Sequence, residues 1–275
     1  MNTIFKKLAV AITFSPTGLA LLKEAIRLKE LFSSDLVLIH SGKRNEETEK
    51  RINNIIIESN LDPSSIEFIW TKGNPAETII DASAHANVDL LIAGALEKES
   101  TFKYYIGSVA RNIMRGASCS VLILKSISEK PIKFRKFCIS TDYSLESENA
   151  IKLSYQIAEL ENADEFIIIH DFYTPGLSSI NIDSNTNSVI LSYQKDEEEK
   201  MNLFIRELNL KGVLVNSKCL FGREGWEEGN YVRSNNIDLF IVNSRSKKFY
   251  FFDRLFPNDL EYTFKNLPSN LLIIK

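Results

Sequence analysis

The sequence is poor in cysteine, glycine and proline, and it has no long hydrophobic run. Its three cysteines, Cys119, Cys138 and Cys219, are far apart and form no C-x-x-C pair, so neither a disulfide framework nor a zinc site is indicated. With 11 glycines and 7 prolines in 275 residues, long flexible linkers are not expected. No apolar stretch approaches the ~18 residues of a membrane span.

The chain also lacks an excess of charge of one sign. Its net charge is −3, whereas a nucleic-acid binder usually carries a basic surplus or stripe, so no nucleic-acid partner is expected. The N-terminus is basic and then apolar, but the short apolar stretch has no small-residue cleavage pattern and fits a buried strand better than a signal peptide. We therefore expect a reduced, cytoplasmic, soluble protein without a membrane span.

Catalytic motifs are absent as well. No Walker A sequence, G-x-S-x-G elbow or H-E-x-x-H pair occurs, and no nucleophile stands with a base in a recognisable pattern. We expect the protein not to be an enzyme, with no catalytic residue and no metal site.

What the chain does contain is an internal repeat. Four apolar segments recur in the same order, at offsets of 129, 130, 149 and 150 residues. The offset grows once, which one insertion at residues 174–193 explains, and its Ser/Asn-rich sequence predicts a loop. We expect two domains, residues 1–130 and 131–275. The recurring segments are KKLAVAITFS and RKFCISTDYS, DLVLIH and EFIIIH, VDLLIAG and IDLFIVN, and VLILK and LLIIK.

Each apolar segment is short, continuous and rich in Val, Ile and Leu, which is typical of parallel strands buried on both faces. Helical patterns separate them, and Ser15-Pro16 suits the start of the first helix. The fold predicted for each half is a doubly wound α/β domain, which binds ligands beyond the carboxyl ends of its strands. The further helices are expected at about 45–60, 75–87, 107–117, 194–210, 225–235 and 257–267.

The strongest local signal follows the fourth strand. Gly94 ends that strand, and Gly107-Ser108 opens a helix whose N–H groups and dipole suit an anion such as phosphate. The alternative is that Gly-Ser merely caps the helix.

These motifs resemble the universal stress protein family, whose pattern after the fourth strand is G-x2-G-x9-G-(S/T). Residues 73–79 (GNPAETI), 88–94 (VDLLIAG) and 119–124 (CSVLIL) resemble further family signatures. The resemblance covers nearly the whole chain twice. It implies two Rossmann-like, adenine-nucleotide alpha-hydrolase-like domains in tandem, whose last strands, VLILK and LLIIK, pair as an intramolecular pseudo-dimer.

The family includes members that bind ATP and members that do not, and this chain departs from the ATP-binding pattern in both halves. The Asp that ends strand one in binders is Thr13 in the first half and Asp142 in the second. Glu97 replaces the second glycine of the phosphate loop. The resemblance implies these candidate nucleotide-binding residues in domain 1: Ala11, Thr13, Ser15, Ser41, Gly94, Glu97, Gly107, Ser108 and Val109.

In domain 2 the same pattern is degenerate. Asp142 is retained, while Asn243 and Ser246 stand at the positions of Gly94 and Glu97, and Phe256-Pro257 replaces Gly107-Ser108. Glu97 would repel phosphate, help coordinate a divalent cation, or face solvent.

Three histidines and one basic-aromatic run have alternative interpretations. His40 and His170 end the second strand of each repeat, where backbone contacts explain them better than a metal or a general base would. His85 is expected on a helix surface. The run at 247–256 suits a nucleic acid or membrane surface, or more simply aromatics that fill a vacated pocket or an interface.

Two functions follow from the resemblance. The first is a non-catalytic stress-response regulator with a degenerate nucleotide site, which acts through contacts with other proteins. The alternative is an ATP-binding sensor that uses the loop Gly94–Ser108 of domain 1, with or without slow ATP hydrolysis. The sequence assigns no cofactor by itself, and the alternative implies ATP with Mg²⁺ in domain 1. The sequence leaves open whether the chain also forms homo-oligomers.

Overall fold

The computed structural model describes residues 4–14, 17–98, 103–105, 107–125, 127–128, 130–172, 184–222, 226–244 and 267–275. The chain forms two compact units, one of residues 1–133 with 259–275 and the other of residues 134–258. Both are α/β with a mostly parallel sheet, as the repeat predicts. The C-terminal strand belongs to the first unit, so the compact units and the sequence repeats differ in where they place it.

The first unit has a doubly wound sheet with the strand order β3-β2-β1-β4-β7-β12. Neighbours are parallel except that β12 runs antiparallel to β7. Leu8, Ala9 and Val10 of the central strand are fully buried, because helices cover both faces. The strands are β1 (Lys7–Ala11), β2 (Asp35–Ser41), β3 (Glu67–Thr71), β4 (Leu90–Gly94), β7 (Ser120–Leu124) and β12 (Asn270–Ile274).

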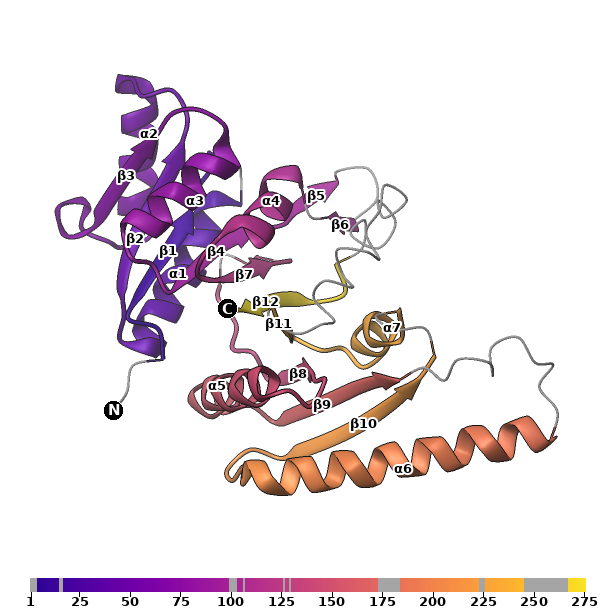
Figure 1. The fold of residues 1–275 in the computed structure, drawn as a ribbon. Helices are drawn as coiled ribbons and strands as arrows, with labels where there is room; N and C mark the ends of the chain where they lie inside the picture. Colours follow the sequence, from indigo (N-terminus) through magenta and orange to yellow (C-terminus); the bar gives the residue numbers. More distant parts are fainter. Residues whose placement is uncertain are drawn as a thin grey trace. The chain divides into compact units, whose positions relative to one another are not determined.

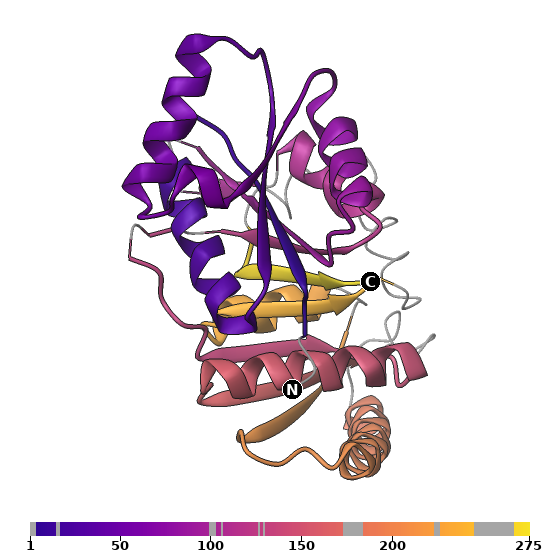
Figure 2. The ribbon, with the colours of Figure 1, turned by 90° about the vertical axis from the view of Figure 1, so that its left-hand side faces the viewer.

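The helices of the first unit are α1 (Gly18–Phe32), α2 (Glu46–Glu58), α3 (Pro75–His85) and α4 (Ser108–Gly116), with a short 3-10 helix at Pro63–Ser65. Figure 2 shows α1 and α2 on one side of this sheet and α3 on the other. The predicted helices at 45–60, 75–87 and 107–117 are confirmed. The predicted start of the first helix is corrected: α1 begins at Gly18 after Thr17, while Ser15 and Pro16 lie outside the described residues.

The second unit repeats the plan with the strand order β10-β9-β8-β11, all parallel. Its elements are β8 (Lys136–Ser140), α5 (Leu145–Glu161), β9 (Glu165–Phe172), α6 (Ser184–Leu208), β10 (Val215–Phe221), α7 (Trp226–Ser234) and β11 (Leu239–Asn243). Figure 1 shows α6 lying along β10. The predicted helix at 225–235 is confirmed. The helix predicted at 257–267 and the run at 247–256 fall outside the described residues, apart from Leu267.

The insertion is where the sequence prediction needs correction. Residues 184–193 do not form a loop but the first part of α6, which was expected to begin only at residue 194. Their Ser, Asn and Thr side chains are weak helix formers, but a helix already nucleated by the following residues extends at little cost, because each added residue gains a hydrogen bond. Residues 173–183 are outside the described part of the chain.

One aspartate that recurs in both repeats has a structural role. Asp89 accepts hydrogen bonds from the backbone N–H groups of Lys6 and Lys7, at 2.8 and 2.9 Å. Asp238, the equivalent residue, accepts them from Arg135 and Lys136 at 2.8 Å. The Asp in VDLLIAG and IDLFIVN therefore fixes the entry into the first strand of each repeat.

The predicted pairing of VLILK with LLIIK is present as the antiparallel pair β7–β12. Leu272 lies opposite Leu122, and Ile273 lies opposite Val121. Asn270 Oδ1 also accepts from Lys125 N at 2.9 Å. None of the helices in the described part of the chain is both long and apolar enough to cross a membrane.

Candidate functional site

Three candidate residues lie at one edge of the first sheet. Ala11, Ser41 and Gly94 are the last residues of β1, β2 and β4, which are parallel neighbours, so their carboxyl ends meet. Ala11 is buried. Ser41 Oγ lies 3.1 Å from Thr78 Oγ1 of α3, so its hydroxyl has a protein partner. Ser15 lies outside the described residues.

The loop after β1 passes close to the start of α1 at Thr13. A Cβ on Gly18 would lie 2.2 Å from the carbonyl oxygen of Thr13, so the loop closes onto the first residue of α1. Only a residue without a side chain fits there. Thr13 is exposed and supplies no carboxylate, unlike the Asp that the resemblance places at this position.

The structure describes part of the segment between Gly94 and Gly107. It contains a short antiparallel pair, β5 (Leu96–Lys98) and β6 (Lys103–Tyr105), with Glu97 opposite Tyr104. The side chain of Glu97 lies outside what the structure describes. A Cβ on Gly94 would lie 3.1 Å from Ile127 Cδ1, so any other residue there would require the Ile127 side chain to shift slightly.

The N-terminus of α4 keeps the features that suit an anion. Gly107 is the N-cap and provides no side-chain cap, which leaves the first N–H groups of the helix without that partner. Ser108 is exposed, and the Val109 side chain that follows is 38% exposed. The positive end of the helix dipole adds to these donors.

In the second unit the retained carboxylate has protein partners. Asp142 Oδ1 accepts hydrogen bonds of 2.5 Å from the hydroxyls of Ser144 and Ser147, and one of 3.1 Å from Ser144 N. Ser144 is the N-cap of α5. Asp142 is therefore part of the structure that begins α5. Asn243 is buried at the end of β11, and Ser246 lies outside the described residues.

The histidines confirm the backbone interpretation. His40 Nδ1 lies 2.9 Å from the carbonyl oxygen of Ile12, and His170 Nδ1 lies 2.8 Å from that of Thr141. His85 is exposed on α3, with Nδ1 at 2.7 Å from the Asp81 carbonyl oxygen. Neither strand-end histidine stands in a metal cluster, because no group of three or more metal-ligating side chains occurs among the described residues.

Each strand-end histidine is part of a stack of side chains that was not predicted from the sequence. The Phe14 ring lies 4.5 Å from His40, and the Arg51 guanidinium lies 5.8 Å from the Phe14 ring centroid. The second unit repeats this stack with three equivalent residues, Tyr143, His170 and Lys200. The Tyr143 ring lies 4.4 Å from His170, and the Lys200 ammonium lies 4.4 Å from the Tyr143 ring centroid. The repeat offsets of 129, 130 and 149 would have revealed it.

Glu197 of α6 gives the second stack a different electrostatic environment. Its carboxylate lies 3.6 Å from His170 Nε2 and 3.5 Å from the Tyr143 hydroxyl. Burial, followed by the nearby Glu197 and Glu198, raises the pKa of the Cys219 thiol to about 11. A thiol with a raised pKa stays protonated at neutral pH and is a poor nucleophile.

Comparisons with known proteins agree with this architecture. Residues 42–125 match the model of the universal stress protein family. A search among curated proteins found no match. A candidate universal stress protein from Pseudomonas aeruginosa UCBPP-PA14 is 18% identical with a TM-score of 0.68, and the alignment covers 98% of this chain and 93% of the other.

Two more structures share the fold over the full length. A protein of unknown function from Pseudomonas aeruginosa PAO1 is 17% identical with a TM-score of 0.70, over 100% of this chain and 95% of the other. A universal stress protein from Archaeoglobus fulgidus DSM 4304 is 15% identical with a TM-score of 0.61, over 99% and 97%. Residues 42–125 thus match the universal stress protein family, and the whole chain has the fold of these structures.

Proposed function

We propose that the chain is a tandem universal stress protein without catalytic activity, a regulator whose nucleotide site has degenerated and which acts through contacts with other proteins. The repeated Asp89/Asp238 contacts and the repeated histidine stacks support a common origin of the two halves. In this proposal the β7–β12 pair is the seam of an intramolecular pseudo-dimer, and the protein works in the cytoplasm.

The observation that carries the proposal is the engagement of Asp142. The resemblance places at this position a carboxylate that helps hold the adenosine, and Asp142 is its one acidic representative in the two repeats. Its oxygen is held by the hydroxyls of Ser144 and Ser147 at 2.5 Å. A ligand would have to replace two short, charge-assisted hydrogen bonds that also stabilise the start of α5.

The first unit retains a different part of the site. The N-terminus of α4 offers donors to a phosphate, but Thr13 provides no carboxylate and Glu97 adds a negative charge to the connecting segment. Near the protein surface, a carboxylate and a phosphate within hydrogen-bond distance repel each other by about 1–4 kcal/mol. The two repeats therefore retain complementary halves of one site.

The absence of catalysis is supported by the state of the nucleophilic side chains. All three cysteines are buried, and burial raises the pKa of each thiol. The Nδ1 atoms of His40 and His170 are directed at backbone carbonyls. These contacts leave no thiol or strand-end histidine poised for covalent chemistry, and in this proposal the chain hydrolyses ATP no faster than buffer does.

The α4 N-terminus favours the second candidate, an ATP-binding sensor in the first unit. In that case Gly107 and Ser108 would receive phosphates, and Glu97 would share a Mg²⁺ ion with them rather than repel them. This role needs the carboxylate of Glu97 to contribute to binding.

Calorimetric titration of the full chain with MgATP distinguishes the two candidates. For the degenerate site we expect a Kd above ~100 μM. The double variant Thr13→Asp with Glu97→Gly should bind at least about tenfold more tightly, because an acceptor for the adenosine is added and a repulsive charge is removed. Asp142→Asn, the matched control in the second unit, should change nothing.

The sensor predicts the opposite pattern. Submicromolar binding by the unmodified chain, lost in Gly107→Val and weakened in Glu97→Gly, would replace the degenerate-site proposal with the sensor. Malachite-green phosphate release on the same samples tests the absence of hydrolysis.

A further inference from the structure

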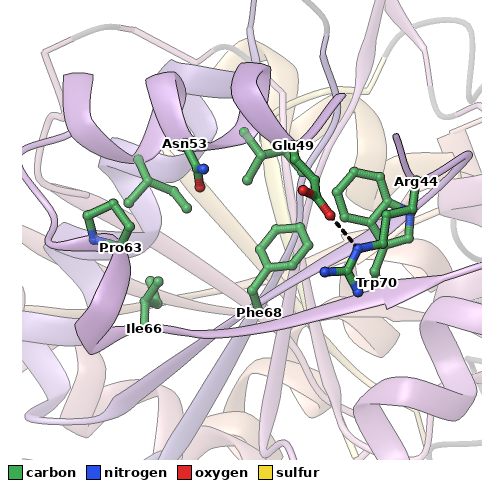
Figure 3. Close-up of a pocket in the computed structure, with 9 residues that line it drawn as sticks. Arg44, Glu49, Asn53, Pro63, Ile66, Phe68 and Trp70 are labelled. Carbon is green, nitrogen blue, oxygen red and sulfur yellow. Dashed lines mark hydrogen bonds and ion pairs between the residues drawn. The ribbon is translucent and has the colours of Figure 1, made fainter. Parts of the chain in front are cut away.

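A pocket lies between α2 and the edge strand β3, and none of its lining residues is among the candidate nucleotide-binding residues. Its volume is about 230 Å³. Figure 3 shows Phe68 near its centre, Asn53 and Glu49 on the helix above it, and Arg44 beside Trp70. Its lining consists of Arg44, Glu49, Ile52, Asn53, Ile56, Pro63, Ile66, Phe68 and Trp70.

The base of the pocket is apolar and held in place. Ile52 and Ile56 of α2 are 3% and 2% exposed, whereas Phe68 and Trp70 are only half-buried. Trp70 Nε1 donates to the Gly42 carbonyl oxygen at 2.8 Å, and the two aromatic ring centroids lie 5.5 Å apart. Two aromatic rings in a fixed orientation offer edges and faces to a third ring.

The rim carries the polar groups. Arg44 Nε donates to Glu49 Oε1 at 2.6 Å, and the guanidinium carbon lies 5.9 Å from the Trp70 ring centroid. Among the described residues, Glu49 is the hydrogen-bond partner of Arg44, so the two Nη groups of the guanidinium can donate to a second carboxylate. Asn53 adds an amide on the next turn of α2.

We propose that this pocket binds a small aromatic carboxylate, with the ring on Phe68 and Trp70 and the carboxylate on Arg44. The size is adequate, since a cavity of about 150 Å³ can hold benzene. The side chains of Arg44 and Glu49 are 68% and 43% exposed. Because an exposed ion pair contributes little to stability, replacing part of this pair with a contact to the ligand costs little free energy. Arginine is also the side chain suited to bidentate pairing with a carboxylate.

The indole N–H signals of the chain provide the measurement. The sequence has two tryptophans, Trp70 and Trp226, and the signal lost in Trp70→Phe identifies that of Trp70. The ¹⁵N-labelled full chain is titrated with benzoate, and with benzyl alcohol and benzylamine as neutral and cationic counterparts. We expect benzoate to shift the Trp70 signal saturably with a Kd near ~1 mM, as its few atoms allow, and at least about fivefold tighter than either counterpart.

Variants separate the contribution of the Arg44 charge to binding from that of the apolar base of the pocket. Arg44→Gln should weaken benzoate about fivefold or more and benzyl alcohol less than about twofold. Asn53→Phe, which places a ring at the mouth, should abolish binding of all three probes. Arg233→Gln, an exposed arginine of α7, is the matched control and should leave every affinity unchanged. Thermal unfolding verifies that each variant is folded.

Three results would overturn the proposal. One is the lack of saturable binding by any probe, and another is equal affinity for benzoate and benzylamine. The third is self-association: if sedimentation shows a dimer that Asn53→Phe dissociates while no probe binds, a second copy of this chain occupies the pocket. None of these readouts depends on ATP, so the test is independent of the proposed function.

Discussion

The carboxylate of Asp142 accepts a hydrogen bond of 2.5 Å from the hydroxyl of Ser147, in the first turn of α5. Gly18 is the residue equivalent to Ser147 in the first repeat, and there the Thr13 carbonyl oxygen occupies the space that a side chain would need. The two repeats thus close the same loop in different ways. One uses a carboxylate and a hydroxyl, and the other uses close approach of the backbone.

Gly18→Ala should destabilise the first unit. The new Cβ would lie 2.2 Å from the Thr13 oxygen, so the loop or the start of α1 must move. We expect the free energy of unfolding to fall by about 2–4 kcal/mol. Urea unfolding followed by Trp70 fluorescence, in a Trp226→Phe background, measures it in the unit concerned.

Gly229→Ala is the matched control for this change. Gly229 lies in α7, and a Cβ added there would have no neighbouring atom within 4 Å, so alanine should gain about 0.5–1 kcal/mol from helix propensity. A Gly18→Ala protein as stable as the unmodified chain would show that the loop closes differently.

Asp142→Ala should destabilise the second unit by about 1–3 kcal/mol. The change leaves Ser144 and Ser147 without their shared acceptor at the start of a 17-residue helix. The control is Asp196→Ala, because Asp196 is exposed on α6 of the same unit and its loss should stay within ~0.5 kcal/mol. Trp226 fluorescence in a Trp70→Phe background reports the second unit. Equal effects of the two changes would contradict a structural role for Asp142.

How much of this could be predicted from the sequence differs between fold and site. The strands and most helices follow from periodicity, because buried parallel strands and amphipathic helices leave strong patterns. The start of α6 could not be predicted in this way, because its Ser, Asn and Thr residues, taken alone, predict a loop. The strand LLIIK was predicted from the repeat and its pairing with VLILK from the family resemblance, and the structure pairs the two as β12 and β7.

The positions of the candidate residues could be predicted from the sequence, but their hydrogen-bond partners could not. The sequence places Ser41, Gly94 and Asp142 at strand ends, yet only the structure shows that Ser41 bonds to Thr78 and Asp142 to Ser144. Hydrogen bonds between side chains depend on the path of a loop, and composition does not determine that path. The stack of Arg51 on Phe14 was missed for the same reason, although it recurs in the second repeat.

Cys219 should contribute to a loss of stability at alkaline pH. Its pKa is raised from 9.0 to about 11 in the folded protein, first by burial and then by Glu197 and Glu198. Between these two values the unfolded chain has lost the proton that the folded chain keeps. The free energy of unfolding therefore falls as the pH rises from about 9 to about 11, and the effect is absent below that range.

Cys219→Ala should flatten part of this fall, and urea unfolding at half-unit steps of pH measures the slope. Other groups contribute to the remaining slope. Burial also raises the pKa values of Cys119, Cys138, Tyr143 and Tyr231, which act in the same direction, whereas it lowers the pKa of Lys275, which acts in the opposite direction. Ser217→Ala on the same strand adds no titrating group and should leave the slope unchanged. An identical slope in Cys219→Ala and the unmodified chain would count against the assignment.

The last strand should stabilise the first unit although it ends the chain. Ile273 of β12 is 0% exposed and lies opposite Val121 of β7. Ile273→Ala leaves a cavity in that contact and should cost about 2–4 kcal/mol. Ile132, 70% exposed in the same unit, is the control, and its change to alanine should cost less than ~0.5 kcal/mol. Because β12 packs on β7, the loss should appear in the Trp70 transition, and a shift confined to the Trp226 transition would instead place this strand's contribution in the second unit.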